Sequence, residues 1–258
     1  MSDRPIVFHH IAIALPRLAD AAGVLVGALG GLPDASAPSR GFNFGCWRYA
    51  GGGRIEVLEP AGADGFLQRF LAQRGPGIHH VTFKVPSLAE ACARAEAHGY
   101  PIVGRDESNP GWKEAFLHPR RALGIVVQFA ESGERSEPPL RLALPPGPPS
   151  PPPPVTVVGL RLRARSRERA RRQWEAVLQG EPAEGDGALL YRWPGSPMRI
   201  AVEVDPAADE GPVAIELASD RPVALPGRPL GITWTIGPLR SLSLPPGGRG
   251  MTRWSSEG

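Results

Sequence analysis

The chain has few cysteines, few lysines and no long apolar run, and each scarcity excludes a class of protein. Two cysteines in 258 residues, Cys46 and Cys92, are too few for a disulfide framework and lack the paired spacing of a zinc–cysteine site. No run approaches the roughly 18 consecutive apolar residues of a membrane helix, and the N-terminus lacks a basic segment followed by an apolar one. We therefore expect a cytoplasmic protein with no membrane partner, in which both cysteines are reduced core residues.

The basic residues favour no nucleic-acid partner. The formal charge is only +3, and Lys84 and Lys113 are the only lysines among 29 basic residues. One cluster exists at residues 160–172 (LRLRARSRERARR), where arginine first alternates with apolar residues and then enters a helical pattern of mixed charge. No aromatic residues interleave with these arginines, so we interpret the cluster as a solvated strand face and helix.

Proline marks the organisation of the chain. Residues 145–154 read PPGPPSPPPP, which cannot donate backbone hydrogen bonds along most of its length and should adopt extended polyproline II. With 41% hydrophobic residues, a chain of this length can bury the core of one large or two small domains. We predict a metal-binding domain over residues 5–132, a stiff linker over 133–154, a second domain over 155–245 and a disordered tail over 246–258.

Two stretches of thirteen residues, 70 positions apart, are nearly the same. Residues 9–21 read HHIAIALPRLADA, and residues 79–91 read HHVTFKVPSLAEA. In each, apolar and other residues alternate as in a strand, a proline interrupts, and apolar or small residues then recur at helical spacing. Hairpin-like strands follow at residues 41–60 and 114–131, so each copy approximates a βαβββ module. The two modules cover about residues 7–60 and 77–131.

The repeat places four polar side chains at equivalent positions. His10 and His80 open the two modules, while Glu56 and Gln128 lie near their ends. Each is on the strand face that its apolar neighbours avoid, and paired modules should share a core around a pseudo-twofold axis. Two imidazoles, a carboxylate and an amide oxygen that converge on one spot would suit a divalent transition metal with open positions.

These features resemble the vicinal oxygen chelate superfamily, which includes glyoxalase I, methylmalonyl-CoA epimerase, extradiol dioxygenases and bleomycin-resistance proteins. The phrases GIHHVTFKV and FLHPRRALGIVVQF are particularly similar to the epimerase and glyoxalase-like branch, where the second histidine of the pair is a ligand. The resemblance covers about residues 7–131 and implies an α+β fold whose paired modules form an open U-shaped sheet. It implies one divalent ion (zinc, nickel, cobalt, manganese or iron) held by His10, Glu56, His80 and Gln128.

One departure from the family pattern bears on catalysis. Where the related enzymes usually carry a glutamate on the last strand of the second module, this chain has Gln128, whose amide cannot take up a proton near neutral pH. Glu56 is the only carboxylate left in the set, so Glu56, or a water on the metal, is the expected catalytic base. The loop RDESNPGWKEA supplies weaker candidates: Glu107 and Glu114 as bases, and Trp112 and Lys113 as substrate contacts.

The remaining histidines have structural interpretations. We expect His9 and His79 to point to the opposite, apolar face and to pack against the helices. His118 is expected to be structural, because it lies in a hairpin strand. Cys92 falls on the buried stripe of its helix and is expected in the core.

The second half is expected to repeat the pattern without the ligands. GLRLRA aligns with HIAIAL, RIAVEVDP with RIEVLEP, and LGITWTI with LGIVVQF. These alignments place Gly159, Ala201 and Thr235 at the positions of His10, Glu56 and Gln128. We predict a third module and a shortened fourth, with a structural role.

The resemblance implies a reaction only in outline. We expect a lyase or isomerase that acts on a small organic acid, thioester or keto compound whose oxygens chelate the metal, through a metal-stabilised enolate. Two alternatives stay open: an extradiol-type dioxygenase, because two histidines and a carboxylate suit non-haem iron, and a non-catalytic protein that sequesters a small molecule. Related domains commonly pair, so the chain either forms a homodimer or uses its second half in the partner's place.

Overall fold

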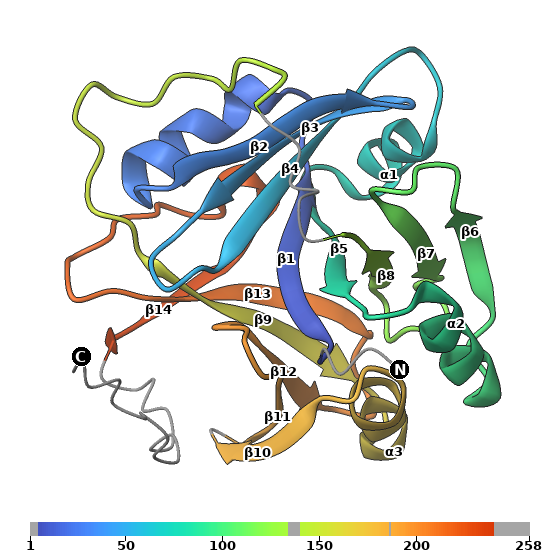
Figure 1. The fold of residues 1–258 in the computed structure, drawn as a ribbon. Coiled ribbons are helices and arrows are strands. Elements are labelled where there is room, and N and C mark those ends of the chain that lie inside the picture. The colour runs from blue at the N-terminus through green and yellow to red at the C-terminus, as the bar shows by residue number, and fades with distance from the viewer. Residues whose placement is uncertain (1–4, 134–139, 186, 240–258) are drawn as a thin grey trace, which may run out of the picture.

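The computed structural model describes residues 5–133, 140–185 and 187–239 (Figure 1). Within these ranges the chain forms two mixed sheets, one of eight strands and one of six, with a few short helices. The α+β class is as predicted. None of the helices in these ranges is long and apolar enough to cross a bilayer.

The first sheet holds both predicted modules side by side. Its strands are β1 (Val7–Ala14), β2 (Leu32–Ser39), β3 (Phe42–Arg48), β4 (Arg54–Pro60), β5 (Gly77–Lys84), β6 (Ile102–Asp106), β7 (Lys113–Leu117) and β8 (Val126–Glu131). They follow the order β2-β3-β4-β1-β5-β8-β7-β6. The central β1 and β5 are antiparallel, and each is parallel to the last strand of its own module. The two βαβββ units are thus related about an axis between β1 and β5.

Helices lie on both faces of the first sheet. η1 (Leu18–Ala21), η2 (Gly23–Ala28) and α2 (Leu88–Ala97) pack into the main core, whereas α1 (Phe66–Arg74) packs through Leu67 against Ala12, Ala14 and Leu58 on the opposite face. Ser87 caps α2, because its side chain accepts a hydrogen bond from the Glu90 N–H. Cys92 is buried on the inner side of α2 and Cys46 is buried on β3, both as free thiols, as predicted.

Two elements of the first half, β2 and α1, are absent from the sequence prediction. β2 reads LPDASAPS, and its two prolines contradict a strand pattern. It is an edge strand, however, where a missing N–H costs no ladder bond on the open side. α1 buries only Leu67, so it lacks a clear apolar stripe.

The second sheet repeats the first in a shortened form. Its strands are β9 (Thr156–Ala164), β10 (Glu181–Gly185), β11 (Ala188–Arg192), β12 (Arg199–Val204), β13 (Gly211–Ala218) and β14 (Trp234–Gly237), and its helices are α3 (Arg167–Arg171), η3 (Arg172–Val177) and η4 (Pro229–Gly231). The order β10-β11-β12-β9-β13-β14 matches β2-β3-β4-β1-β5-β8. The described residues contain no counterpart of β6, β7 or α2 in this half.

The two halves share one hydrophobic core. Phe8 and Phe83 on the central strands stack with their ring centroids 4.9 Å apart. The ring of Trp193, after β11, lies 4.7 Å from Phe83 and 5.9 Å from Phe8, and Trp174 on η3 lies 6.1 Å from Phe83. The face of the first sheet that carries Phe8 and Phe83 is therefore covered by the second half.

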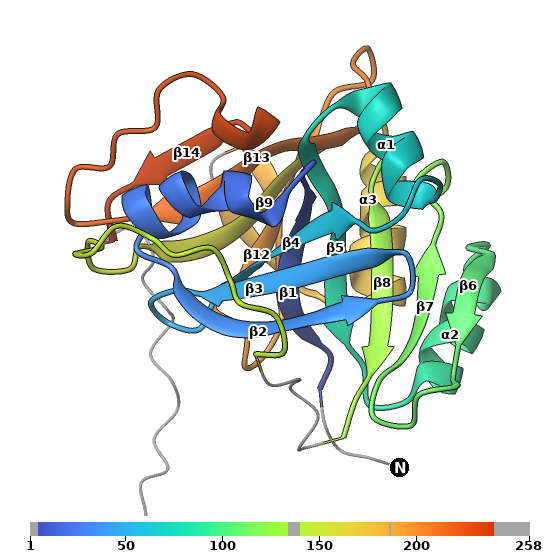
Figure 2. The ribbon, with the colours of Figure 1, turned by 90° about the horizontal axis from the view of Figure 1, so that it is seen from above.

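The proline-rich segment lies against the first module and does not act as a free spacer. In Figure 2 it runs beside η2 and along β2 and β3. The Ser36 hydroxyl donates to the Leu142 carbonyl at 2.7 Å and accepts from the Leu142 N–H at 3.1 Å, while the Val155 N–H donates to the Leu29 carbonyl at 3.0 Å. The domain boundaries remain predictions, and the tail over 246–258 lies outside the described residues.

Candidate metal centre

A β-bulge at each histidine pair turns both imidazoles toward one face of the sheet. Along β1 and β5, Phe8 pairs with Phe83 and His10 with Thr82, so His9 is an extra residue. His79 is extra in the same way, because Ala12 pairs with His80 and Ile13 with Ile78. A bulge interrupts strand alternation. The expectation that His9 and His79 face the apolar side is therefore wrong, although His79 does contact α1, 4.9 Å from the ring of Phe70.

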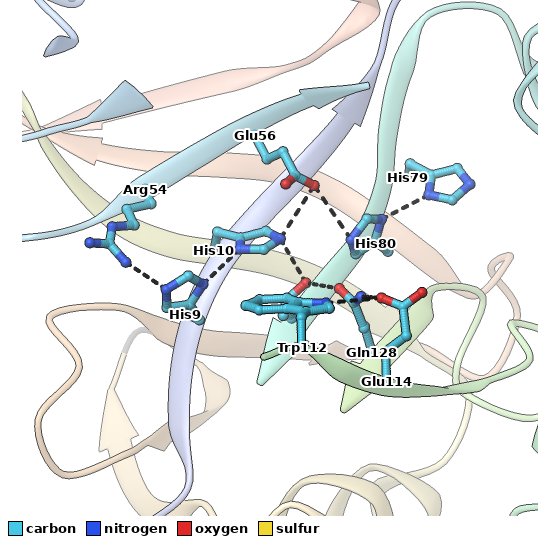
Figure 3. A network of polar contacts seen from close by, with 10 residues as sticks. His9, His10, Arg54, Glu56, His79, His80, Trp112, Glu114 and Gln128 are labelled. Atoms are coloured by element: carbon cyan, nitrogen blue, oxygen red, sulfur yellow. Dashed lines mark hydrogen bonds and ion pairs between the residues drawn. The ribbon is translucent and has the colours of Figure 1, made fainter. Parts of the chain in front are cut away.

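Three of the four predicted ligands converge (Figure 3). The Glu56 Oε2 atom lies 3.4 Å from His10 Nε2 and 3.9 Å from His80 Nε2. One ligand atom from each of these residues lies within 4.8 Å of the others. His10 and His80 are buried, and the Glu56 side chain is only 14% exposed. The chemistry and spacing of this donor set fit a divalent cation with open positions.

Gln128 joins the cluster through Thr82. Its Oε1 atom accepts from the Thr82 hydroxyl at 2.6 Å, and the Thr82 oxygen lies 2.8 Å from His10 Nε2. Its Nε2 atom donates to Glu114 Oε2 at 2.7 Å. Gln128 is therefore next to the three-residue cluster, and its role as a fourth ligand stays a prediction. Thr82 was missed, although the alternation of β5 places it on the same face as His80.

The first histidine pair is connected to a permanent donor. Arg54 NH1 lies 2.5 Å from His9 Nε2, and His9 Nδ1 lies 2.8 Å from His10 Nδ1. Because a guanidinium only donates, a neutral His9 accepts at Nε2 and donates from Nδ1. His10 then accepts at Nδ1 and carries its proton on Nε2, the atom that faces Glu56 and Thr82. A metal on His10 Nε2 requires the opposite tautomer, so metal binding requires a change in either the Arg54–His9 or the His9–His10 contact.

The second pair has no such conflict. His80 Nδ1 lies 2.9 Å from His79 Nδ1, so His80 can donate there and leave Nε2 for a metal. Burial, followed by the neighbouring imidazoles of His79 and His10, lowers the pKa of His80 well below its ordinary value. Burial also lowers the pKa of His79 to about 4. Both rings are neutral at pH 7, and neutral imidazole is the form that binds metals.

Of the four weaker candidates in and near the loop before β7, the structure brings two to the site and leaves two outside it. Trp112 lines the cavity, and its Nε1 donates to Glu114 Oε2 at 3.0 Å. Burial raises the pKa of Glu114. Lys113 is not brought to the site: it alternates to the other side of β7 and donates to Glu131 at 2.7 Å. Glu107 is also outside the site, since it is exposed and paired with Arg105 at 2.6 Å.

A cavity of about 1040 Å³ opens above the cluster. Glu56, His80, Gln128 and Trp112 line it, together with residues that the sequence did not single out. The apolar additions include Phe42, Phe44, Phe66, Phe70 and Phe116, and the basic ones are Arg69, Arg74, Arg120 and Arg141. His118 also lines it and accepts from the Arg120 N–H at 3.2 Å, in line with a structural role. The missed signal is FLQRFLAQR in α1, where aromatic and basic residues recur at helical spacing.

The second sheet has the same register but different chemistry. Gly159 pairs with Glu216 as His10 pairs with Thr82, and single extra residues occur at Val158 and Val213. The ligand positions are occupied by Gly159, Ala201, Ala214 and Thr235. Glu216 instead forms ion pairs with Arg161 at 2.6 Å and Arg199 at 3.2 Å. A Cβ atom on Gly159 would lie 1.9 Å from the Arg199 carbonyl oxygen. The second sheet therefore has no room for a metal-ligating side chain at this position.

Several comparisons with known proteins concern the first half of the chain. The model of the glyoxalase/bleomycin resistance protein/dioxygenase superfamily matches residues 9–116. The uncharacterized protein YqjC of Bacillus subtilis (strain 168) is 29% identical over 126 residues, which cover 47% of this chain and 89% of YqjC. Methylmalonyl-CoA epimerase from Mycobacterium tuberculosis is 24% identical, with a TM-score of 0.45 over 50% of this chain and 89% of the epimerase.

One structural likeness extends over both halves. A mutant of 4-hydroxymandelate synthase from Streptomyces coelicolor matches with a TM-score of 0.59 at 15% identity. The match covers 84% of this chain and 72% of the synthase. At this identity the likeness concerns the fold alone, and it includes the second sheet.

Proposed function

The chain belongs to the glyoxalase/bleomycin resistance protein/dioxygenase superfamily, and from that premise we propose that it is a divalent-metal-dependent enzyme of the lyase or isomerase type. The observation that carries the proposal is the buried group of His10, Glu56 and His80, whose ligand atoms lie within 4.8 Å of one another. Glu56 and His80 of this group line a cavity large enough for an organic substrate.

The proposed roles follow from the contacts of each side chain. His10, His80 and Glu56 would hold the ion, with the amide oxygen of Gln128 as a fourth ligand once the Thr82 hydroxyl turns away. The bound ion would supply Lewis-acid stabilisation of negative charge on substrate oxygens. The apolar walls of the cavity would exclude water from that region, which strengthens electrostatic interactions there.

Two carboxylates compete for the role of proton acceptor. Glu56 directs Oε2 at both histidines, so as a ligand it is a poorer base than the sequence suggests. Glu114 uses Oε2 for its bonds to Gln128 and Trp112, and burial raises the pKa of its carboxyl group toward the working range of a base. Glu114 does not itself line the cavity but bonds to Gln128 and Trp112, which do. We propose that Glu114 accepts the proton and that Glu56 binds the ion, and variants at both positions test this against the earlier expectation that Glu56 is the base.

Metal analysis is the first experiment. Protein purified without chelator or tag histidines would be analysed for metals, beside the variants Glu56→Ala and His80→Ala and the control His98→Ala, which changes an exposed histidine outside the site. We expect about one divalent ion per chain in the parent and the control, and loss in both site variants. No metal in the parent, even after incubation with nickel, zinc, manganese or ferrous ions, would refute the proposal.

A second candidate function rests on the composition of the cluster. Two histidines and one carboxylate form the ligand set of non-haem iron oxygenases, which leaves three positions open. This dioxygenase reading requires activity after anaerobic loading with ferrous iron, with oxygen uptake on catechols. A protein that retains its metal but turns over no epimerase, glyoxalase or catechol substrate would instead support sequestration of a small molecule.

A further inference from the structure

The cavity above the metal cluster has two kinds of wall, and together they indicate a substrate class. Building on the proposed function, we propose that the site takes an extended organic anion with an apolar, ring-bearing body, and not a small keto acid, which is one of the substrate classes that the sequence suggests. The volume of about 1040 Å³ is the first reason. Pockets of about 300–1,000 Å³ bind drug-sized ligands, so a three-carbon acid would leave most of this space to water.

One wall is aromatic. Phe42 on β3 contacts Phe66 on α1 edge-on, with ring centroids 5.7 Å apart, and the ring of Phe70 lies 4.9 Å from His79. Phe66 is 43% exposed and adds apolar surface to this wall. Trp112 faces the cluster from the loop before β7. Flat rings on several sides favour a ligand that carries rings of its own.

The other wall is basic and carries no balancing acid. Four exposed arginines line the cavity: Arg69, Arg74, Arg120 and Arg141. Glu56, at the floor, is the only acidic residue among the described residues that line it. Some exposed arginines elsewhere have partners, as in the pairs Arg17–Asp20 at 2.6 Å and Arg172–Glu168 at 2.5 Å, and others, such as Arg167, have no ion pair among the described residues. Within the described part of the chain, none of the four cavity arginines forms an ion pair.

These walls orient a ligand between them. An anionic group would be attracted to the arginines, and an apolar body would lie on the phenylalanines. The arginines come from α1, from the connection after β7 and from the segment that pairs with β2. Three separate segments thus place the same charge around one opening, which is a stronger indication than a basic run in a single helix.

A matched pair of fluorescent probes tests the inference. 1-Anilinonaphthalene-8-sulfonate and N-phenyl-1-naphthylamine share a ring body and differ in the sulfonate. Neutralising two arginines from different segments, Arg69→Gln with Arg120→Gln, should raise the Kd of the sulfonate probe about three- to tenfold and leave the neutral probe unchanged. Phe66→Ala should weaken both probes. Arg167→Gln on α3, exposed and outside the cavity, is the matched control.

Displacement tests the size of the ligand. 2-Naphthoate should displace the sulfonate probe at a lower concentration than pyruvate does. The inference is overturned if the double arginine variant binds the sulfonate probe like the parent, if it weakens both probes equally, or if pyruvate competes as well as 2-naphthoate.

The probe experiments also distinguish this inference from the proposed function. Each titration would be run on metal-free and metal-loaded samples with the metal content measured. Probe discrimination without any bound metal would retain the ligand class and refute the metal-dependent enzyme. A stoichiometric metal without probe discrimination would refute the ligand class and retain the metal-dependent enzyme.

Discussion

Two carboxylates, Glu56 and Glu114, belong to the same polar network (Figure 3), and the structure gives them different partners. Glu56 faces the imidazoles, whereas Glu114 bonds to Gln128 and Trp112. We expect Glu56→Gln to lose the metal. Glu114→Gln should retain it and lose about 100-fold or more in kcat on any substrate that the screen identifies, since a positioned base contributes roughly that much. Metal loss in Glu114→Gln, or full activity in it, would reverse our assignment.

Arg54 sets the tautomer of His10 through His9, so its removal should favour metal binding. Arg54→Met frees His9 Nε2 to carry a proton, which lets His10 donate from Nδ1 and bind a cation through Nε2. We expect a metal Kd several-fold lower, measured by competition with a chelator. Arg48→Met is the control. Asp34 pairs with both arginines, with Arg54 at 2.9 Å and with Arg48 at 3.7 Å, but Arg48 has no contact with His9 among the described interactions. Equal effects of both variants would show that only net charge matters.

Burial of His79 makes the stability of the metal-free protein depend on pH. The folded pKa is about 4, below the ordinary value of 6.5, so between these values the unfolded chain binds more protons. Stability is therefore full above pH 6.5 and falls as the pH decreases toward 4, by on the order of 3 kcal/mol at most. Urea unfolding at pH 7 and pH 5 measures this loss. His79→Phe should reduce it, while His98→Gln, at an exposed histidine, should leave it unchanged.

At the scale of elements, the segment over 140–142 protects the open edge of β2 and also carries Arg141 to the cavity. Ser36 is fully buried, and its hydroxyl both donates to and accepts from Leu142. Ser36→Ala should lower the free energy of unfolding by about 1–2 kcal/mol and increase amide exchange at Leu142. Ser39→Ala, at an exposed position of the same strand, is the control. Unchanged exchange at Leu142 would show that other contacts hold the segment.

The sequence predicted elements where one physical signal dominated. The repeated strands that begin with HH predicted both modules. The equivalent positions in the two copies predicted that His10, Glu56 and His80 lie together, without any three-dimensional information. The prediction that His9 and His79 face the core failed because strict alternation cannot show a bulge. β2 was hidden by prolines that only an edge strand tolerates, and α1 by its weak apolar stripe, so the aromatic and basic walls of the cavity could not be foreseen.

At the scale of the whole molecule, the second sheet contains largely buried ion pairs where the first has its candidate metal centre. Glu216 is 8% exposed at its side chain and holds Arg161 and Arg199. Glu216→Gln should destabilise the fold by roughly 3–5 kcal/mol, because two largely buried cations lose their partner, yet leave the metal content unchanged. Glu203→Gln, at a side chain 37% exposed, should cost under about 1 kcal/mol. Metal loss in Glu216→Gln would show that the two sheets are coupled.

The shared core favours a second half that stands in the place of a partner subunit. Trp174 and Trp193 pack on Phe83 of the first sheet, and this face is therefore closed within one chain. A homodimer through another face stays a prediction that light scattering would test.

The paired bulges carry a historical implication. In β1 and β5 the extra residue is followed by a histidine that faces the cluster. Val158 and Val213 occupy the same positions in β9 and β13, where Gly159 and Ala214 follow and offer no ligand atom from a side chain. A kink that serves no present ligand is best explained by descent. We infer that the two sheets descend from one duplicated unit, because they share strand order, register and both bulges, and the donor side chains occur at the matching positions of the first copy and not of the second.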